Sequence, residues 1–154
     1  MSRSSWVIGL ATVLHALPSF ALAEGRTVVR PATVPDASFV IANPDLHWHT
    51  NRQGMTVADA VGDPDSTAHS NFIRMNGGTT SDLHRHSFDY YGVVVTGVVV
   101  NEKSASSPER RLTAGSVWYQ KGNEPHVTKC VSSTECVFFV TSPGPFDYVS
   151  VPSH

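Results

Sequence analysis

Residues 78–97 read GTTSDLHRHSFDYYGVVVTG, with a glycine at each end and two histidines, His84 and His86, one residue apart. Side chains at positions i and i+2 of a β-strand point to the same face, about 6.5–7 Å apart along the chain. A strand in this stretch therefore places both imidazoles together. A third histidine, His126, follows 40 residues after His86. The two imidazoles could then converge on one ion, which makes this stretch a candidate metal site.

Short runs of β-branched and aromatic residues, separated by turn signals, continue along the chain and predict an all-β fold. The expected strands cover residues 70–75, 90–96, 98–101, 116–120, 127–131, 136–141 and 147–151. A short helix competes with a strand only over residues 55–61. Many short strands in a chain of 154 residues favour a sandwich or a small barrel.

The first 23 residues have the pattern of a secretory signal peptide. Arg3 precedes an apolar stretch that ends in Ala21-Leu22-Ala23, and we expect cleavage before Glu24. An uncleaved anchor helix is disfavoured because the stretch falls short of the ~20 apolar residues that a bilayer span needs. Residues 24–154 are then enough for one domain with one core, and we expect it to be periplasmic or secreted.

Composition and motifs exclude several other classes of function. Thirteen Asp and Glu residues against eleven Lys and Arg residues give a net charge of −2, and no basic stripe predicts binding to nucleic acid or to an anionic membrane. The sequence has no Gly-x-Ser-x-Gly motif and no phosphate-binding glycine loop. Neither nucleic acid nor a membrane surface is therefore an expected partner.

The stretch at residues 78–97 resembles the first motif of the cupins, Gly-x5-His-x-His-x3/4-Glu-x6-Gly. The two glycines and both histidines match, and Tyr90 stands at the glutamate position. The resemblance implies a single-domain cupin jelly-roll barrel, also called a double-stranded β-helix, over residues 24–154.

Residues 115–130 are similar to the second cupin motif, Gly-x5-Pro-x-Gly-x2-His-x3-Asn. Gly115 and His126 match at the family spacing. The chain departs from the motif with Lys121 at the proline, Asn123 at the second glycine and Cys130 at the asparagine.

The resemblance implies a mononuclear metal site whose ligands are His84, His86 and His126. With no glutamate the ligand set is neutral, which favours an anionic or chelating substrate on the ion. Three protein ligands also leave positions open, as catalysis requires. We expect one divalent transition metal, with iron(II) favoured over zinc, manganese or nickel. The alternative is that the histidines are polar core residues or contact a substrate directly.

Tyr90 is the candidate catalytic residue. On a regular strand it shares a face with His84 and His86, whereas Asp89 points to the other face and reaches the ion only through a bulge. The Tyr90 phenol is then a hydrogen-bond donor to the substrate, a general base, or a core tyrosine.

The remaining histidines and the two cysteines receive separate interpretations. His47, His49 and His69 have no third ligand at a recognisable spacing and are expected at the surface or in the core. Cys130 and Cys136 flank five residues between two expected strands, so a hairpin favours a disulfide in an exported protein. The alternative is a Cys130 thiolate close to the metal.

Two functions follow from these expectations. The first is an exported mononuclear metal enzyme of oxygenase, lyase or isomerase type, acting on a small, oxygen-bearing, chelating substrate. It is distantly similar to three-histidine cupin dioxygenases that cleave diketones. The second is a periplasmic cupin that binds a metal or a small ligand without turnover. Because many cupins pair through their sheets, a homodimer is also expected.

Overall fold

The computed structural model describes residues 37–152. Within this range, the strands follow from an alternation of buried and exposed side chains along the sequence. A 3-10 turn, η1 (Asn43–Asp45), precedes the strands. The strands are β1 (His49–Thr50), β2 (Thr56–Val61), β3 (His69–Met75), β4 (His84–Arg85), β5 (Tyr90–Thr96), β6 (Val98–Glu102), β7 (Leu112–Thr113), β8 (Val117–Gln120), β9 (Val127–Cys130), β10 (Cys136–Ser142) and β11 (Val149–Ser150).

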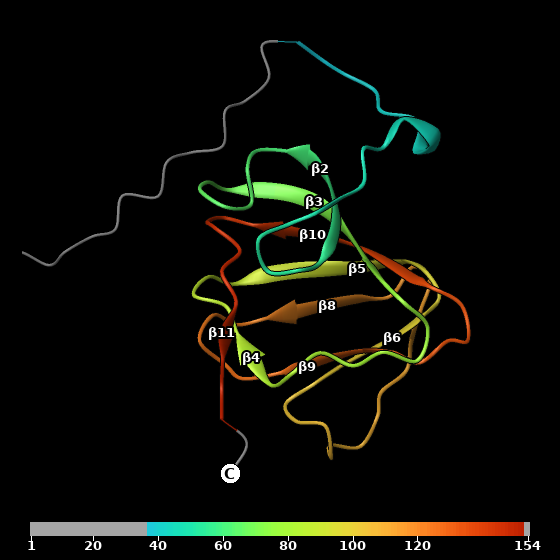
Figure 1. Cartoon of the computed structure of the whole chain (residues 1–154), viewed down its shortest axis with the longest axis vertical. Helices are drawn as coiled ribbons and strands as arrows, with labels where there is room; N and C mark the ends of the chain where they lie inside the picture. The colour runs from blue at the N-terminus through green and yellow to red at the C-terminus, as the bar shows by residue number, and fades with distance from the viewer. Residues whose placement is uncertain (1–36, 153–154) are drawn as a thin grey trace, which may run out of the picture.

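The strands form one large sheet and two small ones, and every pairing is antiparallel. The large sheet has the order β1-β2-β3-β10-β5-β8, and the small sheets have the orders β7-β6-β9 and β11-β4. Figure 1 shows β4, β6 and β9 gathered on one side of the large sheet. The described residues form a single all-β jelly-roll domain, as the sequence predicts.

The core lies between the sheets. Strand β10, in the interior of the large sheet, shows how the sequence determines which side chains enter this core. Phe138 and Val140 are buried, while Phe139 between them is only half-buried. On the neighbouring strand β5 the same period of two buries Tyr90 and Val94 and exposes Val95. Because one residue of slip would exchange the two faces, this alternation fixes the register of the central strands.

Three glycines of the two motifs have backbone angles that other residues rarely adopt. The φ angles of Gly78, Gly97 and Gly115 are 72°, 79° and 86°. At Gly97 a β-carbon would also lie 2.8 Å from the sulfur of Cys136. Asn123, at the second glycine of the other motif, has φ 63°. Asparagine tolerates this left-handed conformation better than most residues. Asn123 can therefore replace the motif glycine without a change in the backbone conformation that glycine favours.

The structure decides one choice that the sequence left open and corrects one assumption about a strand. Within residues 55–61, where helix and strand competed, Thr56–Val61 form strand β2, and Val57 and Ala58 are buried and pair with β3. No single regular strand runs from position 84 to position 90. β4 ends at Arg85, and an irregular segment leads to β5 at Tyr90.

Cys130 and Cys136 form a disulfide with 5.7 Å between their α-carbons, which confirms the predicted bridge. The bridge joins the end of β9 to the start of β10, so it connects the three-stranded sheet to the large sheet. No free cysteine remains in the described part of the chain, and a Cys130 thiolate ligand is therefore excluded in this state.

Across residues 37–152, no helix has both the length and the apolar character that crossing a bilayer requires. The predicted signal peptide, residues 1–23, lies outside the described residues.

Candidate metal centre

A backbone pair between β4 and the turn before β9 brings two of the predicted ligands together. The amide of His84 donates to the carbonyl of His126 at 3.0 Å, and the amide of His126 donates back at 2.8 Å. The ring centroids of these two residues are 4.3 Å apart, and His86 completes the group at 4.9 Å from His84 and 5.2 Å from His126. All three side chains are buried, and one ligand nitrogen from each lies within 4.8 Å of the others.

The same local hydrogen bond orients two of the three rings. Nδ1 of His84 lies 2.8 Å from the carbonyl of Asp82, and Nδ1 of His126 lies 3.2 Å from the carbonyl of Glu124, in each case two residues earlier. A carbonyl only accepts, so Nδ1 carries the proton in both neutral rings. Nε2 then has its lone pair free, which is the form that a metal ligand needs.

A segment distant in the sequence orients the third ring. Nδ1 of His86 donates to the carbonyl of Asp147. The Asp147 carboxylate accepts from the amide of Ser87 at 2.7 Å and from the hydroxyl of Ser87 at 2.6 Å. Asp147 therefore holds the irregular segment after β4 against the C-terminal part of the domain, and His86 has the same tautomer as the other two rings.

Two aromatic side chains cover the group, and sequence reasoning missed both. Tyr148 stacks on His84 with a centroid distance of 4.2 Å, and Phe146 stacks on His86 at 3.9 Å. Neither of the two cupin motifs includes these positions, and about 60 residues separate them from the histidines. Only their approach in the folded chain assigns them to the site.

The site opens into a cavity of about 380 Å³. Its lining includes His84 and His86, with Tyr90 between the sheets and Tyr148 near the C-terminus. The other lining residues are Gln53, Gly54, Met55, Thr56, Ile73, Arg74, Met75, Asn76, Thr79, Thr80, Ser81, Asp82, Thr128, Phe138 and Phe146.

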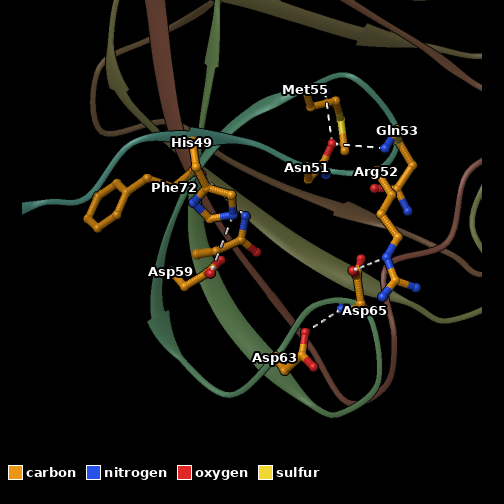
Figure 2. Close-up of polar contacts among 10 residues, drawn as sticks. His49, Asn51, Arg52, Gln53, Met55, Asp59, Asp63, Asp65 and Phe72 are labelled. Carbon is orange, nitrogen blue, oxygen red and sulfur yellow. Dashed lines mark hydrogen bonds and ion pairs between the residues drawn. The ribbon is translucent and has the colours of Figure 1, made fainter.

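One wall of the cavity is a turn between β1 and β2 that Figure 2 shows in detail. The side-chain oxygen of Asn51 accepts from the amides of Gln53 and Met55 at 3.1 and 2.9 Å. Arg52 reaches across to Asp65 at 3.1 Å. These contacts hold Gln53 and Met55 beside the cavity.

The structure brings Tyr90 to the three histidines and keeps Asp89 away. The Tyr90 hydroxyl lies 3.2 Å from Nε2 of His126, and the side chain is buried. Asp89 instead accepts from the Tyr119 hydroxyl at 2.7 Å and from the amide of Gly122 at 2.8 Å, outside the site. Both side chains lie where the sequence led us to expect, although the strand assumed for this is interrupted, and the catalytic role of Tyr90 stays a prediction.

Burial determines the charge of the site. It lowers the pKa of His84, lowers that of His86 to about 4 and lowers that of His126 to about 3, so all three imidazoles are neutral at pH 7. For His126 the neighbouring His84 lowers the pKa further. Burial also raises the pKa of Tyr90, so its phenol is protonated at neutral pH.

The metal-free protein is expected to lose stability as the pH falls from 6.5 to 5. The unfolded chain binds protons on His86 and His126 near pH 6.5, whereas the folded protein binds them only near pH 4 and pH 3. The unfolded state then holds more protons, and each residue lowers the free energy of unfolding by up to about 1.4 kcal/mol per pH unit. Urea unfolding at pH 7, 6 and 5 measures this. A stability that is flat over this range would contradict neutral burial of these rings.

The other histidines lie apart from this group. His47 and His49 are exposed, and Nε2 of His49 is 3.7 Å from the Asp59 carboxylate (Figure 2). His69 is buried on β3, with Nδ1 3.2 Å from the carbonyl of Thr67 and its ring edge-on to Phe146. These positions agree with the surface and core roles expected from the sequence.

No family model matches the chain, and no curated protein matches it. Solved structures do. The polyketide cyclase RemF from Streptomyces resistomycificus is 14% identical with a TM-score of 0.63, over 77% of this chain and 88% of that one. An RmlC-like cupin from Shewanella frigidimarina is 16% identical with a TM-score of 0.53, over 72% of this chain and 93% of that one.

A third solved structure with this fold is the DMSP lyase DddQ from Ruegeria pomeroyi. It is 15% identical with a TM-score of 0.54, over 69% of this chain and 61% of that one. At these identities the likeness concerns the fold alone. The chain has the cupin fold, and within it three histidines form a group that could hold a metal ion.

Proposed function

We propose that this protein is a metal-dependent enzyme that holds one divalent transition metal, with iron(II) favoured, between His84, His86 and His126. The observation that supports the proposal is that the three imidazole rings have the same tautomer. Each directs Nδ1–H to a backbone carbonyl and leaves Nε2 as an acceptor, and the three buried residues converge. Three convergent neutral imidazoles suit a transition metal.

The cavity supports a small chelating substrate. Its lining contains two charged side chains, Arg74 and Asp82. The Arg74 guanidinium lies over the Trp48 ring at 3.8 Å and pairs with Glu135 at 3.4 Å, so it is already engaged. A bound ion would be the main positive charge, and it would stabilise an oxyanion such as an enolate on the substrate. We therefore propose a substrate with one chelating, oxygen-bearing group and an otherwise uncharged body.

The apolar lining suits the body of such a substrate. Met55, Ile73, Met75 and Phe138 lie along the cavity, beyond the histidines. Tyr90 is the protonated donor nearest to the ligand nitrogens, and we propose that it positions the substrate oxygen. The reaction is of oxygenase, lyase or isomerase type.

Elemental analysis of the untagged protein tests the metal site before any substrate is known. We expect close to one transition-metal ion per chain. Oxygen uptake by the iron(II) form with a panel of diketones and hydroxy-carbonyl compounds then tests turnover. Stoichiometric metal with tight ligand binding and no turnover would favour the binding protein over the enzyme. Metal-free protein that fails to take up added divalent ions would overturn both.

We also propose that the protein is exported to the periplasm or the medium. The support is the signal-peptide pattern of residues 1–23 together with the Cys130–Cys136 disulfide, since such bonds persist in oxidising compartments. N-terminal sequencing of the protein from the periplasm or the medium is expected to begin at Glu24. Intact Met1 in a cytoplasmic fraction would contradict export.

A homodimer stays a prediction, and the large sheet offers a face for it. Six of the exposed large apolar side chains of the described residues lie on this face: Phe39, Ile41, Tyr91, Val95, Val117 and Tyr119. Lysine at both Val117 and Tyr119 is expected to convert a dimer into a monomer in light scattering, because charge would replace apolar contact. Ala105→Lys, in an exposed loop, is the control. A wild-type monomer at high concentration would contradict the prediction.

A further inference from the structure

One of the three ligand nitrogens already has a partner in the folded chain. Because Nδ1 of His126 donates to the carbonyl of Glu124, its Nε2 is an acceptor. The hydroxyl of Tyr90 lies 3.2 Å from that nitrogen and is the donor of the bond. The lone pair that a metal needs from His126 is therefore occupied by the Tyr90 proton.

The other two ligands differ in this respect. Among the hydrogen bonds of residues 37–152, none reaches Nε2 of His84 or His86, whose rings contact backbone carbonyls through Nδ1. Both residues line the cavity, whereas His126 is 1% exposed and is absent from the lining. An ion that enters from the cavity can thus meet two free nitrogens first and the Tyr90-bonded nitrogen last.

The Tyr90 ring has little room to leave. It is edge-on to His86, to Phe146 and to Trp118, with centroid distances of 5.3, 5.1 and 6.4 Å. Freeing Nε2 of His126 would therefore need rotation of the O–H bond about the C–O axis and a small shift of the phenol oxygen, because an ion bound to Nε2 at about 2.1 Å needs part of that space. No proton is transferred, and the hydroxyl then points away from Nε2.

We propose that Tyr90 is a latch on the third ligand: it donates to Nε2 of His126 in the metal-free protein, and a bound ion displaces it. The released hydroxyl, beside the ion and at the edge of the cavity, becomes a donor to the oxygen of a ligand on the ion. This inference rests on the proposed metal site. It makes Tyr90 a positioning residue whose donor is available only when the metal is bound.

The latch is tested by whether the Tyr90→Phe substitution raises or lowers the affinity for metal. Tyr90→Phe removes the competing donor, so the metal-free variant is expected to bind Zn²⁺ about 2- to 10-fold more tightly than wild type, the range of one net hydrogen bond. The affinity is measured by competition with a chromophoric chelator at pH 7. Tyr119→Phe is the matched control, because it also removes one phenol hydroxyl, and that hydroxyl donates to the Asp89 carboxylate outside the site. Its affinity is expected to stay within twofold of wild type.

The opposite results have different meanings. Weaker binding by Tyr90→Phe would show that the phenol is itself a metal ligand, and unchanged binding would show no competition; either result overturns the latch while leaving the three-histidine site intact. Failure of wild type to bind Zn²⁺ would instead overturn the proposed function. A readout without metal is the ¹⁵N chemical shift of His126 Nε2. It is expected to move in Tyr90→Phe and to stay in place in Tyr119→Phe, and an identical shift in wild type and Tyr90→Phe overturns the latch.

Discussion

Replacing His126 by alanine is expected to lower the affinity for Zn²⁺ by more than about 100-fold and to remove the metal from the purified protein. Loss of only a hydrogen-bond partner of a ligand commonly costs 10- to 100-fold in affinity, and loss of a direct ligand should cost more. The backbone pair between positions 84 and 126 needs no imidazole, so the remaining two ligands should keep their places. Competition with a chelator and elemental analysis measure the two effects.

His69→Ala is the matched control for this variant. His69 is a buried histidine of the same core, and its ring is outside the group of three. The His69→Ala substitution removes the same side-chain volume as His126→Ala and is also expected to lower the stability of the fold. Thermal unfolding of both variants measures this effect. We expect His69→Ala to retain the metal. A His126→Ala protein with full metal content would refute the three-histidine assignment.

Replacing Cys130 and Cys136 together by alanine is expected to lower the free energy of unfolding by roughly 2–3 kcal/mol. The bridge closes a short loop of the unfolded chain, with a sequence separation of 6, and chain entropy gives this magnitude. Alanine avoids placing a new hydroxyl in the core, where both residues are buried. Urea unfolding under two-state conditions measures the difference.

A reductant provides the internal control for the disulfide. Wild type with a thiol reductant should approach the stability of the double variant, and the double variant should not respond. Because the bridge connects β9 with β10 at the end of β9 remote from His126, Zn²⁺ affinity should change far less than stability. Two free thiols in the untreated protein would contradict the bond.

Much of the fold follows from local patterns in the sequence. The period-two alternation around Val94 and Phe138 predicts strands with one buried face, and the structure has them. The stretch at residues 55–61 was ambiguous because its apolar residues fit either period, and pairing of β2 with β3 decided it. The interruption of the strand after Arg85 was not predictable, since it depends on Asp147 holding Ser87.

The sequence by itself determined the group of three histidines, the inward position of Tyr90 and the pairing of the two cysteines. Strand geometry accounts for the pair at His84 and His86 and a short loop for the cysteines, whereas His126, 40 residues further on, was assigned through the resemblance to the cupin motifs. Only the tertiary structure decided that Tyr148 and Phe146 stack on the ligand rings and that Tyr90 donates to Nε2 of His126. These contacts join segments tens of residues apart. The distance and orientation between such segments are set by how the sheets pack, which no local pattern encodes.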